Sequence, residues 1–175
     1  GKLMNSGQTC IAPDYVLVSS KVKSQLLGHM VSEIKKFYGN KPIDSSDFGR
    51  IVNLNHFKRL KNLLPSKVFF GGEFDESRLK ISPTILEVEK DDPIMEDEIF
   101  GPILPVIELK SLDAGIEFIR SKEKPLALYL FTNSNEIQKK VIENVSFGGG
   151  VINDTLIHIA NGNLPFGGVG ASGIG

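Results

Sequence analysis

The single cysteine of the chain, Cys10, ends the polar segment Asn5-Ser6-Gly7-Gln8-Thr9-Cys10, whose glycine marks it as a turn. The pattern of residues 11–18 is typical of a turn that leads into a β-strand. A thiolate held by backbone N–H groups at such a junction is a nucleophile for covalent catalysis. For any lone cysteine the alternative is a small buried thiol with only a packing role. The residues on either side of Cys10 are therefore needed to distinguish a catalytic thiol from a packing thiol.

Three segments of the chain carry motifs that favour catalysis. They are Met4-Asn5-Ser6-Gly7-Gln8-Thr9-Cys10-Ile11-Ala12-Pro13-Asp14-Tyr15, Met95-Glu96-Asp97-Glu98-Ile99-Phe100-Gly101-Pro102, and Leu164-Pro165-Phe166-Gly167-Gly168-Val169-Gly170 with Ser172-Gly173. In this order they resemble the catalytic-cysteine, Glu-Ile-Phe-Gly-Pro and Pro-Phe-Gly-Gly motifs of the aldehyde dehydrogenases. The first looks most like the class 3, or fatty-aldehyde, branch, and the resemblance runs from about Met4 to the last residue.

The resemblance implies a covalent mechanism with Cys10 as the nucleophile. The thiolate adds to an aldehyde carbonyl to give a thiohemiacetal, hydride passes to NAD or NADP, and an activated water hydrolyses the thioester to a carboxylic acid. The backbone N–H of Cys10 is an expected oxyanion donor, because preorganised N–H groups stabilise developing charge. Asn5 and Gln8 are expected to set the turn, and Gly7 to adopt a backbone shape that other residues resist.

Two residues of the second motif match cofactor contacts of the family. Glu98 matches the glutamate that accepts hydrogen bonds from the nicotinamide ribose hydroxyls, a role that suits a carboxylate. Phe100 matches the aromatic residue that packs beside the nicotinamide. Without the motif, Glu98 is a solvated acid within an acidic run, and Phe100 is an ordinary core or turn aromatic.

The resemblance also points to two residues of the substrate pocket. Phe166 matches a residue that lines the family's substrate tunnel, and it could equally be a structural plug between Pro165 and two glycines. His158 lies in an Asn-Asp…His run similar to one in the class 3 branch, with a purely structural role as the alternative. His29 and His56 are interpreted as ordinary surface residues.

Composition excludes several classes of function. The chain of 175 residues has 20 Lys and Arg against 21 Asp and Glu, so no basic excess points to nucleic acid. No apolar stretch approaches the length of a membrane span. One cysteine excludes an internal disulfide and a thiolate zinc site, and we expect no metal centre. A reducing, cytoplasmic compartment fits this cysteine content best.

Strand and helix patterns alternate along the chain, which predicts an α/β fold with an open, mainly parallel sheet and flanking helices. Helices are expected over residues 21–38 and 55–64, after Ser111, and after Asn133 or Ser134. Strands are expected at residues 68–70, 84–88, 104–107 and 126–131. The glycines at 148–150 follow a helix instead of opening one, so they do not form a dinucleotide fingerprint.

The resemblance further implies that residues 1–175 are the cysteine-bearing catalytic domain of a longer aldehyde dehydrogenase, without its N-terminal cofactor-binding region. The general base would lie outside the chain, and the isolated chain is expected to be inactive and to self-associate. The full-length protein is expected to be a homodimer or other homo-oligomer that acts on a small-molecule aldehyde.

Three other functions stay open at this point. The first is a relative that transfers the acyl group to coenzyme A or reduces an acyl phosphate. The second is a hydrolase that pairs Cys10 with His158. The third is a binding domain that has lost catalysis, in which Cys10 would be no more reactive than a free thiol.

Overall fold

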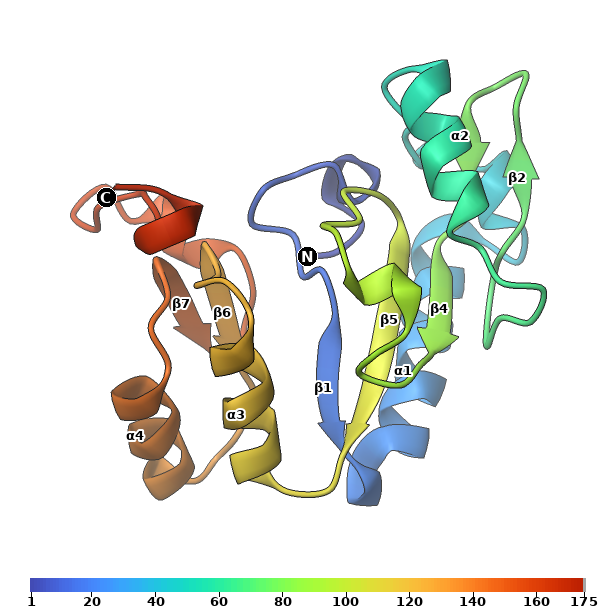
Figure 1. The fold of residues 1–175 in the computed structure, drawn as a ribbon. Coiled ribbons are helices and arrows are strands. Elements are labelled where there is room, and N and C mark those ends of the chain that lie inside the picture. Colours follow the sequence, from blue (N-terminus) through green and yellow to red (C-terminus); the bar gives the residue numbers. More distant parts are fainter. Residues whose placement is uncertain (175) are drawn as a thin grey trace. The chain divides into compact units, whose positions relative to one another are not determined.

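A computed structural model describes residues 1–174, which fold into two compact units (Figure 1). The first unit spans Lys2–Lys110, and the second begins at Ser111 and includes Gly1. No helix among the described residues combines the length and the apolar character needed to cross a lipid bilayer.

The first unit is built on a three-stranded parallel sheet in the order β1-β5-β4. The strands are β1 (Val16–Ser19), β5 (Ile103–Leu109) and β4 (Thr84–Glu87). The central strand β5 pairs with both neighbours, and its first five residues are all buried. This continuous apolar run is what a strand covered on both faces requires.

The long helix α1 (Ser20–Tyr38) follows β1 directly and packs on this sheet (Figure 1). Ser19 caps its N-terminus by accepting a hydrogen bond from the N–H of Lys21. Gly39 ends it at a φ of 78°, a conformation that suits glycine. The interface between α1 and the sheet is formed by Val18, Leu27, Ile34, Ile85 and Val106.

A second core of the first unit lies under α2 (Leu54–Asn62) and the antiparallel ribbon of β2 (Phe74–Asp75) and β3 (Lys80–Ile81). Its buried members are Ile51, Phe57, Leu60, Ile81, Leu86, Ile94, Ile99 and Ile103. Short 3-10 turns η2 (Pro42–Asp44) and η3 (Pro93–Met95) complete the connections. This core anchors α2 through Phe57 and Leu60.

The predicted strand at residues 68–70 is wrong. Only Phe70 pairs there, in an isolated antiparallel bridge with Ile85. Gly71 and Gly72 follow at φ values of 80° and 84°, so the chain turns before a strand can extend. The ribbon forms later, at β2 and β3, in a stretch too polar and too short to show an alternating pattern.

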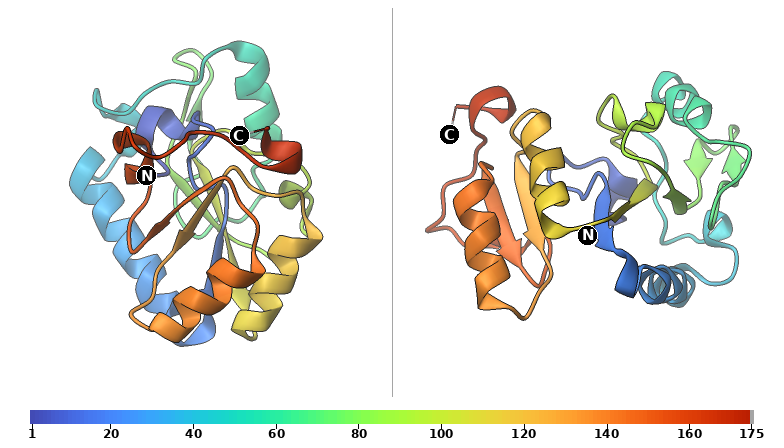
Figure 2. Two further views of the ribbon diagram at one scale, coloured as in Figure 1. Left: turned by 90° about the vertical axis from the view of Figure 1, so that its left-hand side faces the viewer. Right: turned by 60° about the horizontal axis from the view of Figure 1, so that its bottom comes forward.

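The second unit places helices α3 (Leu112–Ser121) and α4 (Asn135–Asn144) over the parallel pair β6 (Ala127–Leu130) and β7 (Gly149–Ile152). Figure 2 shows the two helices side by side on these strands. Ser111 and Ser134 cap the helices, as predicted. The core of this unit is formed mainly by Leu112, Ile116, Ile119, Leu128, Leu130, Ile137, Val141, Val145 and Phe147.

The α/β class and the mainly parallel pairing are confirmed. The described strands are divided among three sheets, and the β2–β3 ribbon is the antiparallel one. Two 3-10 turns, η4 (Ile157–Ala160) and η5 (Gly170–Ser172), follow β7.

Candidate active site

The Cys10 turn, residues 4–12, begins with the 3-10 turn η1 (Met4–Gly7), whose last three residues have a left-handed backbone. Asn5, Ser6 and Gly7 have φ values of 50°, 55° and 77°. This region is unfavourable for residues with a Cβ, although Asn tolerates it better than most. The turn therefore needs specific contacts to hold it.

Two side chains of the motif supply those contacts. The Asn5 amide donates to the Gln8 carbonyl at 3.1 Å, and the Gln8 amide donates to the Asn5 carbonyl at 3.0 Å. Gln8 also donates to the carbonyl of Arg50 at 3.1 Å and accepts from the N–H of Val52 at 2.9 Å. These bonds agree with the interpretation of Asn5 and Gln8 as residues that set the turn.

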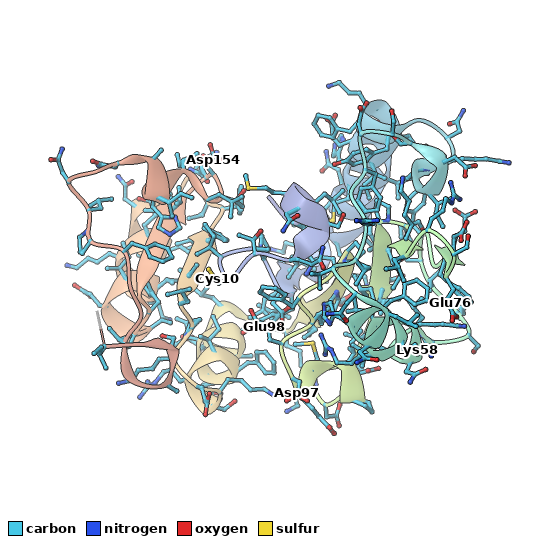
Figure 3. The ribbon with its side chains drawn as sticks, turned by 90° about the horizontal axis from the view of Figure 1, so that it is seen from above. Cys10, Lys58, Glu76, Asp97, Glu98 and Asp154 are labelled. Atoms are coloured by element: carbon cyan, nitrogen blue, oxygen red, sulfur yellow. The ribbon has the colours of Figure 1, made fainter. Side chains whose placement is uncertain are left out.

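Cys10 itself is exposed, while its neighbours are anchored. The N–H of Ala12 donates to the Thr9 carbonyl at 2.9 Å, which closes a tight turn around the cysteine. Ile11 is buried in the core. Since the side chain of Cys10, labelled in Figure 3, is exposed, a substrate can reach the sulfur.

A glycine contact joins the Cys10 turn to the second motif. A Cβ at Gly7 would lie 2.1 Å from the carbonyl oxygen of Gly101, closer than real Cβ atoms approach. A Cβ at Gly101 would lie 2.6 Å from a methyl group of Leu60 on α2. The two glycines thus let the Cys10 turn, the second motif and α2 stack directly on one another.

The Glu98 turn, residues 97–101, is held by side chains from elsewhere in the first unit. Asp14 accepts a hydrogen bond from the N–H of Ile99 at 3.1 Å. Arg59 donates to the carbonyl of Ile99, and His56 Nε2 lies 2.8 Å from the carbonyl oxygen of Phe100. Phe100 has a φ of 54°, so these contacts hold a conformation that an aromatic residue disfavours.

The interpretation of His56 as an ordinary surface residue is wrong. Its ring is half-buried, packs edge-on against Phe100 at 6.3 Å between ring centroids, and bonds the Phe100 backbone. Arg59 and Asp14 were likewise not identified from the sequence. The spacing of His56 and Arg59 does indicate a shared role, because residues three apart lie on one face of a helix.

The charged groups around Glu98 are partly buried. Lys2 is only 8% exposed, and its ammonium lies 3.9 Å from the Asp14 carboxylate. Burial lowers the pKa of Lys2 to about 8, and the nearby Asp14 and Glu98 oppose this shift. Burial also raises the pKa of Asp14, against the effect of Lys2.

Glu98, labelled in Figure 3, keeps its side chain exposed. Its pKa is raised, first because packed neighbours remove part of its hydration and then because Asp14 is negative, while Lys2 and Arg59 act in the opposite direction. An exposed carboxylate on a constrained turn can accept hydrogen bonds from a bound ligand.

The other two predicted site residues belong to the second unit. His158 is 9% exposed, and its ring packs so closely on Gly149 that a Cβ there would lie 2.6 Å from it. Its Nδ1 has no hydrogen-bond partner among residues 1–174. Phe166 is 58% exposed and does not plug the core of its unit. The first unit therefore carries Cys10, Glu98 and Phe100, and the second carries His158 and Phe166.

Within residues 1–174, no three or more His, Cys, Asp or Glu side chains gather so that they could hold a metal ion. The charged cluster at the Glu98 turn combines carboxylates with Lys2 and Arg59, which favours mutual pairing over cation binding.

Comparison with known proteins gives the same family over the whole chain. The family model described as the aldehyde dehydrogenase family matches residues 1–175. The 4,4'-diaponeurosporen-aldehyde dehydrogenase of Staphylococcus aureus is 52% identical, covering 100% of the chain and 39% of that protein. Aldehyde dehydrogenase family 3 member A2 of Mus musculus is 49% identical (100% and 37%), and the dimeric NADP-preferring aldehyde dehydrogenase of Rattus norvegicus is 48% identical (100% and 39%).

Solved structures agree. A substrate-bound state of Staphylococcus aureus AldH matches with a TM-score of 0.97 and 51% identity, covering 99% of the chain and 39% of that structure. The glyceraldehyde-3-phosphate dehydrogenase GapN of Methanocaldococcus jannaschii, complexed with NADP, matches at 0.84 and 32%, covering 98% and 38%. The chain spans about two fifths of the length of these relatives. With its three motifs in order and this similarity over its whole length, the chain belongs to the aldehyde dehydrogenase family.

Proposed function

We propose that the protein carrying this chain oxidises a medium-chain, long-chain or aromatic aldehyde to a carboxylic acid, with Cys10 as the nucleophile. The Cys10 sulfur bonds to the carbonyl carbon, and the backbone N–H of Cys10 donates to the oxyanion that forms. Loss of hydride from this thiohemiacetal leaves a thioester. Water then attacks the thioester, which releases the acid and restores the thiol.

The observation that carries the proposal is the contact between Gly7 and Gly101. It joins an exposed cysteine to a constrained turn that presents a carboxylate, Glu98, within one compact unit. Covalent catalysis followed by a redox step needs such an arrangement, because the nucleophile and the cofactor must meet at the same carbon.

The residues of the Glu98 turn fit a nicotinamide cofactor, either NAD or NADP. The Glu98 carboxylate is exposed and can accept from two neighbouring ribose hydroxyls. Phe100 is half-buried beside it and offers an aromatic surface for a flat ring. When bound, the nicotinamide supplies the hydride acceptor. The similarity to a relative named as NADP-preferring makes NADP a cofactor to test alongside NAD.

The test is an aldehyde oxidation assay with the protein at its full natural length. Wild-type protein with NAD or NADP should produce reduced cofactor, read by its absorbance, and Cys10→Ser should reduce turnover by on the order of 10⁴-fold or more. Wild-type protein that reduces neither cofactor with any aldehyde of these classes would overturn the proposal.

Three added measurements separate the alternatives. Formation of an acyl-CoA when coenzyme A is present favours acyl transfer. Ester cleavage that is independent of cofactor favours a hydrolase that uses Cys10 and His158. A Cys10 that reacts with iodoacetamide no faster than a free thiol favours a binding domain.

The chain alone is proposed to be inactive, because the general base that activates the hydrolytic water is expected outside it. Clear turnover by residues 1–175 with aldehyde and either cofactor would contradict this. The isolated chain is also expected to self-associate, which sedimentation at high concentration tests.

At full length we propose a homodimer, by similarity to the relative named as dimeric. Light scattering coupled to size exclusion measures this directly. A monomeric full-length protein would contradict it. The cytoplasmic compartment stays a prediction from the single cysteine.

A further inference from the structure

We propose that His56 and Arg59 on α2 are positioning residues that hold the Glu98 turn in the conformation that binds the cofactor. This inference rests on the proposed function, because it gives these two side chains a role in presenting Glu98 and Phe100. Neither residue would touch the substrate or the reacting atoms.

The Glu98 turn needs external support. Phe100 has a φ of 54°, a region that costs conformational free energy for a residue with a Cβ. Such a conformation persists only where surrounding contacts determine it. Two successive carbonyls of the turn, those of Ile99 and Phe100, accept from Arg59 and His56 of one helix. The support is therefore concentrated on the two residues that follow Glu98.

The contact of Arg59 with His56 determines the tautomer of the imidazole. Arg59 Nε lies 3.4 Å from His56 Nδ1, and a guanidinium can only donate, so Nδ1 is the acceptor. The proton therefore lies on Nε2, which donates to the Phe100 carbonyl at 2.8 Å. Arg59 thus bonds the turn directly and also orients the second donor.

The helix that carries these residues is itself firmly anchored. Asn53 caps α2 by accepting from the N–H of His56 at 2.9 Å. Phe57 and Leu60 of the same helix are fully buried, and Gly101 packs against Leu60. A rigid support of this kind is what precise ligand contacts need, because errors of a fraction of an ångström weaken them.

The experiment measures cofactor affinity and kinetics of full-length variants. His56→Leu and Arg59→Met should each raise the cofactor Kd and KM by about tenfold, the effect of losing one hydrogen bond that positions a ligand contact. The KM for the aldehyde should stay unchanged. His56→Gln places an amide N–H near the position of Nε2 and should restore most of the affinity.

Matched controls separate positioning from simple loss of stability. His29→Leu makes the same substitution at an exposed position of α1, and Lys58→Met changes an exposed residue of α2, labelled in Figure 3. A purely structural role would lower the fraction of active enzyme, and hence kcat, without changing the cofactor KM. The double variant of His56 and Arg59 should lose less affinity than the product of the single losses, because Arg59 also acts through His56.

The outcomes are distinct. If the wild-type protein oxidises aldehydes but the Leu, Met and Gln variants bind cofactor like the wild type, the positioning role is overturned and the proposed function stands. A His56→Gln variant as weak as His56→Leu also overturns it, provided that both melt at the wild-type temperature. A wild-type protein that binds neither NAD nor NADP overturns both.

Discussion

The Cys10 turn and the Glu98 turn both place residues other than glycine at positive φ, but they are held in different ways. In the Cys10 turn, Asn5 and Gln8 bond each other's backbone across three residues. In the Glu98 turn, the supporting side chains come from 40 to 85 positions away in the sequence. A local motif therefore specifies much of the first turn, to which Gln8 adds bonds to Arg50 and Val52, whereas the side chains that support the second turn are all distant in sequence.

Gly7 is the point where the two turns meet, and its substitution should have the largest effect. In Gly7→Ala the new Cβ would overlap the Gly101 carbonyl and would also oppose a φ of 77°. We expect a loss of about 4 kcal/mol in the free energy of unfolding, from steric overlap and backbone strain together. Chemical denaturation measures it, with Gly28→Ala in an open part of α1 as control. A Gly7→Ala variant as stable as the control would show that Gly7 and the Gly101 carbonyl are not in close contact.

Lys2 links the turns electrostatically through Asp14, and it should make stability depend on pH. Burial lowers the pKa of Lys2 in the folded protein to about 8, from a usual value of 10.5. Below pH 8 the lysine is protonated in both the folded and the unfolded state. Between pH 8 and pH 10.5 the unfolded chain holds more protons on Lys2 than the folded protein does, so the free energy of unfolding should rise with pH. The rise attributable to Lys2 should total about 3 kcal/mol over the window.

The measurement is the difference in unfolding free energy between wild type and Lys2→Met, followed from pH 7 to 10. Lys36→Met, at an exposed lysine, is the control. A difference that does not change with pH would mean that Lys2 is solvated in the folded protein.

Asp14 bonds the Glu98 turn from the segment that follows Cys10, and its loss should destabilise the protein by about 2 kcal/mol. Asp14→Ala leaves the N–H of Ile99 and the buried Lys2 ammonium without their partner. Asp14→Asn keeps an acceptor for Ile99 and should cost less. Thermal unfolding compares the two variants. Equal losses would assign the effect of Asp14 to its charge alone.

Gln8 should show the smallest effect on stability, because its bonds lie near the protein surface. Gln8→Ala removes contacts to Asn5, Arg50 and Val52, and we expect a loss of about 1 kcal/mol. The reactivity of Cys10 toward iodoacetamide should change more than the stability, since the turn that presents the thiol is released. Unchanged alkylation kinetics would indicate that the Cys10 turn holds its shape without Gln8.

Much of the fold follows from local patterns in the sequence. The helices after Ser19, Asn53, Ser111 and Ser134 begin at side chains that accept from the first helical turn. The buried strand β5 is a continuous apolar run, and such runs are recognisable at short range. The strand predicted at residues 68–70 failed because Gly71 and Gly72 turn the chain. The β2–β3 ribbon has no recognisable pattern in the sequence, because its strands are two residues long.

The sequence by itself identified the family through three motifs in order, and it predicted the turn before Cys10, because the Asn5–Gln8 hydrogen bonds that shape this turn lie within a few residues. Only the tertiary structure showed that Gly7 rests on Gly101, that Lys2 is buried beside Asp14, and that His56 bonds Phe100. Those contacts join separate segments of the first unit, which come together when its apolar side chains are buried. The sequence around His56 does not show whether its ring faces water or bonds the backbone carbonyl of Phe100.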